Sequence, residues 1–382
     1  MRILLAGDYP PDARLGSTKV LVKLQEEFRA LGHDCDLLLA DGIGDWPRNN
    51  YLRQALGPVV TLKAVRRMVR ARGRYDVVDI ASADGLWVGV LRRLGAFRGT
   101  AVIARSNGIE HLNYRRMLED HDAGLLYKPW TRRIVHPLLR LTQVGAAARA
   151  ADRLILLNDL DRAFVLARGW KPADRIDVVP HGVSERFLAE APPPGQPRGG
   201  GILFCGTWGE MKGISYLVAA FSQLVARGSS ARLTVLGGGV PEASIRAAFA
   251  PDVRSRVTVL DRVDEAGVMS AYRAHDVLVL PSTYEGFGMV VLEAMSQRLP
   301  VVVTPVGCAF ALVEDGTTGL VVPPRDSAAI ADALARLMGD AALRARLAEA
   351  AFARVRGMTW ANTARLTLDV YERARAERSG RD

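Results

Sequence analysis

The sequence predicts an α/β protein with two parallel sheets, and three observations support this prediction. Short apolar runs of strand length alternate with helical apolar periods from one end to the other, a pattern typical of parallel strands joined by crossover helices. The alternation stops at residues 191–200, where ten residues contain four Pro and three Gly, and it restarts at Ile202. The length of 382 residues fits two or three domains. We therefore expect an interdomain linker at 191–200, a first domain over 1–185 and a second over 186–359.

The first domain is predicted to begin with a strand at Arg2–Ala6, followed by a loop and a helix. Ser17 or Thr18 is expected to cap that helix, because short hydroxyl side chains accept hydrogen bonds from the first helical amides. Residues 41–58 contain Gly, Pro and Asn at short intervals, so we expect a loop there. A basic helix is expected after this loop, ending near Arg72.

A polar segment, 105–111, follows the predicted strand Ala101–Ala104 and reads RSNGIEH. Open α/β sheets bind ligands beyond the carboxyl ends of their strands. Asn107 and His111 are therefore candidates for a ligand site, although His111 also fits an ordinary helix surface.

The most informative stretch runs from Pro281 to Asp326. An apolar strand at Val277–Leu280 precedes the loop Glu285-Gly286-Phe287-Gly288, and a helix is predicted from Met289 to about Gln297. Glycines allow a close backbone approach, and the first amides of a helix form a phosphate site. The carboxylates of Glu285 and Glu293 flank that site. Taken alone, the Gly-Phe-Gly loop would fit an ordinary turn, but the whole pattern favours a ligand site.

A second glycine-rich turn opens the second half of the chain. It reads GTWGEMKG over 206–213 and leads from the strand Ile202–Cys205 into a helix. Lys212 lies at the mouth of this turn, where its ammonium group can bind a diphosphate. A surface Lys on a plain turn is the alternative.

These two segments resemble the donor-site motifs of retaining GT-B glycosyltransferases of family 4, including the E-x7-E pattern at 285–293. The resemblance implies the GT-B fold, with two Rossmann-like domains whose parallel sheets face each other across a cleft. It also implies that a C-terminal helix at about 360–382 packs back on the first domain. It assigns catalysis to Lys212, Glu285 and Asn107. It assigns donor binding to Gly16, Thr207, Gly286, Phe287, Gly288, Met289, Val290 and Glu293.

The chain departs from that family pattern at four places. Thr207 stands where relatives often carry an Arg, and Asn107 is the nearest residue to a His of the family. Gly16 is followed by Ser where a second Gly is usual. The segment 307–311, GCAFA, lacks the carboxylate that relatives carry there.

The resemblance implies transfer of a sugar, with retention, from a UDP- or GDP-linked donor to a carbohydrate or lipid-linked acceptor. No cofactor and no metal ion are expected, and Cys and His show no metal-ligand spacing. Two alternatives stay open: a nucleotide-sugar epimerase of the same fold, and a catalytically silent binding module. The sequence lacks the tight glycine turn of a dehydrogenase after its first strand.

Charge is concentrated in the first half of the chain. Residues 1–185 hold 29 Lys and Arg against 21 Asp and Glu, or +8 of the net +10. Two basic runs with apolar residues between the charges, Lys63–Arg74 and Lys128–Arg140, suit an anionic membrane surface, an anionic acceptor or a solvated helix face. No nucleic-acid motif accompanies them. We therefore expect envelope polysaccharide or glycolipid synthesis.

The expected location is the cytoplasm, with peripheral attachment to the inner face of the membrane as a variant. No uncharged apolar run reaches the ~18 residues of a membrane span. The first residues lack the long apolar core of a signal peptide. The three Cys are far apart in apolar surroundings, which favours reduced core residues.

Overall fold

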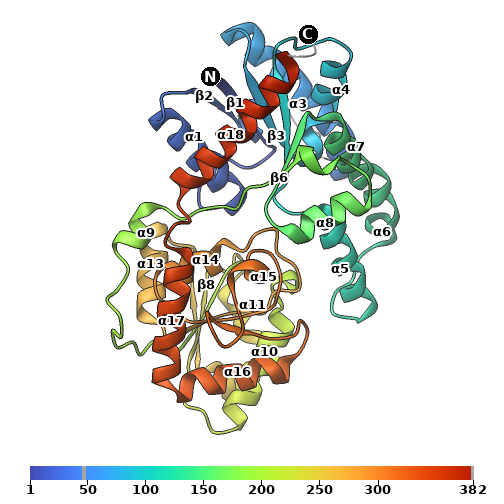
Figure 1. Cartoon of the computed structure of the whole chain (residues 1–382). Coiled ribbons are helices and arrows are strands. Elements are labelled where there is room, and N and C mark those ends of the chain that lie inside the picture. The colour runs from blue at the N-terminus through green and yellow to red at the C-terminus, as the bar shows by residue number, and fades with distance from the viewer. Residues whose placement is uncertain (45–48, 380–382) are drawn as a thin grey trace. The chain divides into compact units, whose positions relative to one another are not determined.

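The computed structural model describes residues 1–44 and 49–379 (Figure 1). The chain divides into two compact units. Unit 1 contains Met1–Arg115, Tyr127–His181 and the C-terminal helix, and unit 2 contains Arg116–Leu126 and Gly182–Thr359. Each unit has a six-stranded parallel sheet with helices, which confirms the predicted α/β class.

The sheet of unit 1 has the strand order β2-β1-β3-β4-β5-β6. Its central strands are fully buried and mostly apolar, as expected of parallel strands covered on both faces. Its strands are β1 (Arg2–Ala6), β2 (Asp34–Leu38), β3 (Val77–Ala81), β4 (Ala101–Arg105), β5 (Arg153–Leu156) and β6 (Ile176–Val178). The helices that begin in this unit are α1 (Gly16–Ala30), α2 (Ala40–Ile43), α3 (Asn50–Arg72), η1 (Ser82–Gly85), α4 (Leu86–Arg93), α5 (Glu110–Asp122), α6 (Trp130–His136), η2 (Pro137–Leu141), α7 (Thr142–Ala150), α8 (Asp159–Ala167), η3 (Ala173–Arg175) and α18 (Trp360–Ser379).

The sheet of unit 2 has the order β12-β11-β10-β7-β8-β9. Its strands are β7 (Ile202–Cys205), β8 (Leu233–Leu236), β9 (Val257–Leu260), β10 (Val277–Leu280), β11 (Val301–Val303) and β12 (Leu320–Val321). Its helices are α9 (Glu185–Ala189), η4 (Glu210–Lys212), α10 (Ile214–Ala226), α11 (Glu242–Ala247), α12 (Pro251–Arg254), α13 (Glu265–Ala274), α14 (Met289–Ser296), α15 (Ala309–Leu312), α16 (Ser327–Gly339) and α17 (Ala341–Val355).

The C-terminal helix α18 packs within unit 1, beside α1 (Figure 1). The rings of Phe28 and Tyr371 lie 5.7 Å apart. The Tyr371 hydroxyl donates to Asp79 Oδ2 at 2.5 Å, and the same oxygen accepts from Arg105 Nη2 at 2.6 Å. All three polar groups are buried, so α18 supplies part of the hydrogen bonding inside the unit 1 sheet.

Two local predictions in the first domain were wrong. The helix α1 begins at Gly16 with Leu15 at its N-cap and no side-chain cap, because Thr18 lies inside the first turn and donates instead to the Pro10 carbonyl at 2.8 Å. The loop predicted over 41–58 contains α2 and the start of α3. The helix α3 begins early because Asn49 Oδ1 accepts from two helical amides, and Pro58 lies inside it.

The Pro-rich segment 191–200 is not a free linker. Arg198 donates to the carbonyl oxygens of Gln297 at 2.8 Å, Arg298 at 3.1 Å and His275 at 3.3 Å. These bonds hold the segment against unit 2, because one guanidinium group satisfies several carbonyl oxygens at once. The amino-acid composition of the segment does not predict these hydrogen bonds of Arg198.

Candidate active site

The turn that carries Lys212 is fixed against the end of strand β10. Gly213 follows Lys212 with φ +70°, and a Cβ atom there would lie 2.0 Å from the Pro281 carbonyl oxygen. Only glycine fits this close backbone approach. The turn that ends β7 therefore lies directly beside the start of the loop 281–288.

This approach brings Lys212 and Glu285 into contact. Lys212 Nζ lies 2.6 Å from Glu285 Oε1, and Ser282 Oγ donates to the same oxygen at 2.7 Å. The side chains of Lys212 and Glu285 are only 16% and 7% exposed. A charged pair from two segments 73 residues apart is thus held largely out of contact with solvent in unit 2.

The loop 285–288 leads into the N-terminus of α14. Gly288 is the N-cap, with φ +87°, and no side chain caps the helix. The first amides, of Met289 and Val290, therefore offer donors at the positive end of the helix dipole. Gly286 precedes the buried Phe287, whose carbonyl accepts from the Cys308 amide at 2.5 Å.

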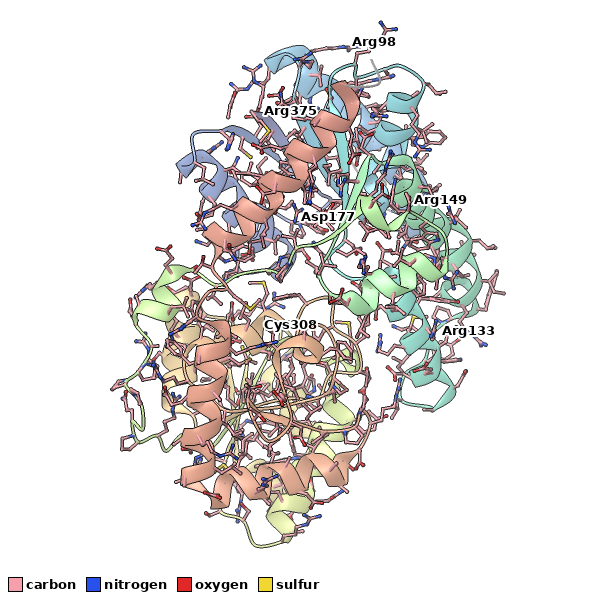
Figure 2. The ribbon with its side chains drawn as sticks, in the orientation of Figure 1. Arg98, Arg133, Arg149, Asp177, Cys308 and Arg375 are labelled. Atoms are coloured by element: carbon pink, nitrogen blue, oxygen red, sulfur yellow. The ribbon has the colours of Figure 1, made fainter. Side chains whose placement is uncertain are left out.

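The neighbouring turn at Gly307 closes tightly on this loop. A Cβ atom at Gly307 would lie 2.5 Å from the Phe287 carbonyl oxygen and 2.7 Å from Glu285 Cβ. Cys308, labelled in Figure 2, is buried, and burial raises the pKa of its thiol. The segment 307–311 contains no carboxylate that could bind a ligand. Its contribution to the site is packing against the loop 285–288.

Glu293 lies on the buried side of α14. Its Oε2 accepts from the Tyr272 hydroxyl at 3.0 Å. Tyr272 is fully buried, and this burial raises the pKa of its phenol well above the usual value. The phenol therefore stays protonated and fixes the orientation of the Glu293 carboxylate.

Arg262, in the loop after β9, is a further candidate site residue. Its Nη2 donates to Thr207 Oγ1 at 3.4 Å. A Cβ atom at the adjacent Gly206 would lie 3.7 Å from the Lys212 side chain, so Lys212 and Arg262 both border this turn. Thr207 stands at the position where relatives often carry an Arg. The guanidinium group of Arg262, 55 residues later in the chain, lies against it.

Asn107 and Gly16 belong to unit 1. Asn107 follows β4, and its Nδ2 donates to the Tyr9 hydroxyl at 2.9 Å. Its Oδ1 is buried without a hydrogen-bond partner among the described residues. Gly16 begins α1, and a Cβ atom there would meet nothing within 4 Å. Packing therefore does not require glycine at position 16.

A network of charges surrounds Asn107 in unit 1. Arg140 Nη1 lies 3.0 Å from Asp84 Oδ1, and Arg140 Nε lies 3.0 Å from Glu110 Oε2. Burial raises the pKa of Asp84, and burial together with Asp84 raises the pKa of Tyr9. Asp84 and Tyr9 follow β3 and β1, so the network occupies the sheet edge where α/β proteins bind ligands.

Within the described residues, no group of three or more His, Cys, Asp or Glu side chains is arranged to hold a metal ion. None of the helices in the described parts of the chain is both long and apolar enough to cross a membrane.

Solved structures with similar folds cover nearly the whole chain. A sucrose-phosphate synthase from Thermosynechococcus elongatus superposes with a TM-score of 0.78 at 21% identity, over 99% of this chain and all of the other. The Anabaena protein HepE, in complex with UDP and glucose, gives a TM-score of 0.71 at 17% identity, over 98% of this chain and 100% of the other. With two six-stranded parallel sheets, the chain therefore has the GT-B fold.

Sequence comparison finds a family match for part of the chain. Residues 199–340 match the model of the glycosyl transferases group 1. Alpha-D-kanosaminyltransferase of Streptomyces kanamyceticus is 30% identical over 251 residues, which are 63% of this chain and 64% of that protein. Phosphatidyl-myo-inositol mannosyltransferase of Mycobacterium leprae is 35% identical over 215 residues, which are 54% and 57% of the two chains.

The second half of the chain, residues 199–340, is therefore similar to the glycosyl transferases group 1, which agrees with the resemblance found in the motifs of that half. The chain spans less than two thirds of the length of these two curated relatives.

Proposed function

We propose that this protein transfers a sugar, with retention of anomeric configuration, from a UDP- or GDP-linked donor to a carbohydrate or lipid-linked acceptor. The observation that carries the proposal is the Lys212–Glu285 pair beside the uncapped N-terminus of α14. The matches to curated glycosyltransferases and to a fold neighbour solved with UDP and glucose support it.

Lys212, Arg262 and the first amides of α14 would hold the diphosphate. Negative charge grows on this leaving group as the glycosidic bond breaks, and each well-placed donor lowers the barrier by about 3 kcal/mol. Arg262 would take the role of the Arg that Thr207 replaces. The donors of this chain would supply the positive charge, with no metal ion or cofactor in the proposed reaction.

Glu285 would bind hydroxyl groups of the donor sugar and balance positive charge at the anomeric carbon. Lys212 pairs with this carboxylate, and a bound diphosphate would compete for the same ammonium group. Glu293, oriented by Tyr272, would bind the ribose hydroxyls. The acceptor hydroxyl would attack from the face that the diphosphate leaves, and its proton would pass to the departing phosphate oxygen.

The charged network around Asn107 would bind the acceptor. Its carboxylates and the unpaired Asn107 Oδ1 can accept hydrogen bonds from sugar hydroxyls. Asn107 would therefore act as a binding group, because an amide does not carry a proton.

An anionic membrane surface is the partner that we propose for α6 and η2. Trp130, Ile134 and Leu138 are 66%, 53% and 66% exposed and recur every fourth residue. Residues 123–151 contain five Lys and Arg and no Asp or Glu. Exposed apolar side chains beside an excess of positive charge are typical of helices that lie on anionic lipid. Such attachment suits synthesis of an envelope polysaccharide or glycolipid.

The function is tested by incubating the protein with UDP- and GDP-sugars and a panel of sugar and lipid-linked acceptors. We expect a glycoside of retained configuration, and we expect Glu285→Gln to abolish turnover while UDP or GDP still binds. A changed donor sugar in the absence of acceptor would instead indicate the epimerase. Donor binding without turnover on any acceptor or water would indicate the silent binding module.

A further inference from the structure

A cavity of about 630 Å³ lies in unit 1, away from every residue assigned to the proposed reaction. Its walls come from the end of α4, the loop 95–99, the residue before β5 and the last turns of α18. It therefore lies where β4 and β5 begin, whereas the network around Asn107 lies where β4 ends. Six of its lining residues are arginines: Arg74, Arg92, Arg93, Arg98, Arg175 and Arg378.

Among the described residues, the acidic residues that line the same cavity are Asp152 and Glu377. Asp152 forms an ion pair with Arg92, and its other oxygen accepts from the Val102 amide at 2.8 Å. Glu377 lies 3.9 Å from Arg175 and also pairs with Arg153. The described lining residues thus carry an excess of four positive charges, and both carboxylates already form ion pairs.

Two of the remaining guanidinium groups bind backbone oxygens. Arg93 Nε donates to the Ala150 carbonyl at 3.0 Å, at the end of α7, and Arg378 donates to the Thr100 carbonyl. These bonds satisfy carbonyl acceptors at the end of a helix and just before a strand, but a carbonyl group does not neutralise a full charge. The arginines therefore stabilise this edge of unit 1 while leaving a positive field in the cavity.

Arg74 and Arg98 are exposed and have no carboxylate or carbonyl partner among the described residues. Arg98 projects from the loop between α4 and β4 (Figure 2). The Arg74 side chain lies over Gly99, where a Cβ atom would come within 2.6 Å of its Nη1. Gly99 therefore leaves room for a guanidinium group that no described acidic group holds.

The field also acts on a neighbouring lysine. Lys171 Nζ donates to the Arg149 carbonyl at 3.0 Å. Burial, followed by the charge of Arg93, lowers the pKa of Lys171 to about 8. The charge of Arg93 therefore adds to the effect of burial, which is the larger cause, while Asp152 opposes both.

We propose that this cavity binds an anion that carries at least two phosphate charges. A guanidinium group presents two parallel N–H donors that match a phosphate, and the volume fits a compact phosphorylated molecule. The same chemistry could come from a free diphosphate or from the headgroups of anionic phospholipids. The proposal stands apart from sugar transfer, since none of its residues belongs to the candidate active site.

The test measures pyrophosphate binding by calorimetry in the full chain carrying Lys212→Met, which weakens phosphate binding at the candidate active site. In that background we expect Arg74→Ala/Arg98→Ala to weaken binding about ten-fold. The matched control is Arg66→Ala/Arg70→Ala, which removes the same charge from exposed positions of α3 outside the cavity. We expect this control to bind as tightly as the parent.

Equal weakening by both pairs would mean general charge attraction and would overturn the proposal. A parallel arm measures sedimentation with vesicles of phosphatidylcholine, with and without phosphatidylglycerol. Binding that requires phosphatidylglycerol, and that is reduced by Arg74→Ala/Arg98→Ala but not by Arg66→Ala/Arg70→Ala, identifies the lipid headgroup as the source. Absence of binding in both arms would also overturn the proposal. Melting temperatures measured without ligand show whether each variant is folded. If Arg74→Ala/Arg98→Ala is unstable, the single variant Arg98→Gln replaces it in both assays.

Discussion

The ion pair between Lys212 and Glu285 joins two loops of unit 2 through one short contact. Removing one partner of a buried pair leaves the other charge poorly solvated, which usually costs more than the pair itself contributes. We predict that Lys212→Met lowers the free energy of unfolding by about 2–3 kcal/mol, less than for fully buried pairs because Lys212 keeps some solvent contact.

The check is chemical denaturation of Lys212→Met, Glu285→Gln and the double variant. The double variant should recover much of the loss, since no unpaired charge remains. Additive losses would contradict the interpretation that these two side chains stabilise each other.

Arg262 lies against the residue that replaces an arginine of the family. If it binds the diphosphate, Arg262→Ala should weaken UDP or GDP binding about ten-fold, the loss expected for one charged hydrogen-bonding group. Arg227→Ala is the matched control. Arg227 is an exposed arginine of unit 2 at the end of α10, and it pairs with Asp332. Titration calorimetry measures both. An unchanged affinity in Arg262→Ala would exclude Arg262 from the phosphate site.

At the scale of elements, the turn between β7 and α10 depends on one glycine. Gly213→Ala would introduce a contact of 2.0 Å with the Pro281 carbonyl at a positive φ, so we predict a loss of more than about 2 kcal/mol. Gly209→Ala in the same turn meets nothing within 4 Å and has φ −160°, so it should be nearly neutral. Thermal unfolding of the two variants tests this, and equal melting temperatures would refute it.

Helix α6 and η2 carry the predicted membrane contact, and Arg133 lies on the outer side of unit 1 in Figure 2. We predict that Trp130→Gln/Leu138→Gln and Arg132→Glu/Arg133→Glu each reduce sedimentation with vesicles containing phosphatidylglycerol. Each basic side chain near anionic lipid is worth about a five-fold change in binding.

The matched control for the apolar pair is Leu31→Gln/Leu94→Gln, since both leucines are exposed in unit 1 outside α6 and η2. Vesicle binding that is unaffected by either α6 variant would reject this surface. Loss of a concentration-dependent dimer in the same variants, without a change in vesicle binding, would identify a protein interface instead. The assay contains neither donor nor acceptor, so it is independent of catalysis.

Much of the element pattern follows directly from the sequence. The strands β7 and β10 were predicted from their apolar runs, and the turn after each was predicted from its glycines. The start of α3 was missed because Pro58 and the Gly-rich residues before it favour a loop locally, whereas the Asn49 cap and the packing of the helix favour a helix. Local propensity decides such boundaries only where tertiary contacts are weak.

At the scale of the whole molecule, three partly or fully buried histidines predict sensitivity to acid. Burial lowers the pKa values of His111 and His136 to about 4 and that of His181 to about 3, below the usual 6.5. The unfolded chain binds protons at these sites below pH 6.5 and the folded chain does not. The stabilisation that the neutral histidines give to the folded state is therefore complete above pH 6.5 and is lost as the pH falls toward 4.

Asp161 acts in the opposite direction, because burial raises its pKa from 3.8 to about 7. Its unfavourable ionisation weakens the folded state as the pH rises from about 4 to 7. We predict that His111→Phe flattens the acid-side fall in melting temperature and that Asp161→Asn steepens it. Melting curves from about pH 4 to 7.5 measure both. Identical pH profiles in wild type and both variants would contradict this account.

The candidate site was predictable only in part. The motifs gave Lys212 and Glu285, because each lies in a glycine-rich turn after a strand. The place of Arg262 against Thr207 could not be predicted, since only the folded sheet brings the end of β9 beside the turn after β7. The arginine cavity was missed as well, because its charges come from segments that are far apart in sequence and meet only where strands β4 and β5 begin.

The last helix, α18, has a consequence for synthesis of the chain. The Tyr371 hydroxyl that binds Asp79 leaves the ribosome after all of unit 2 has been made. The nascent chain must therefore carry an unfinished amino-terminal unit, with apolar surface exposed, while the later unit is already able to fold. A premature stop codon just before Trp360 would spare the carboxyl-terminal unit and leave the first-made half of the protein dependent on chaperones.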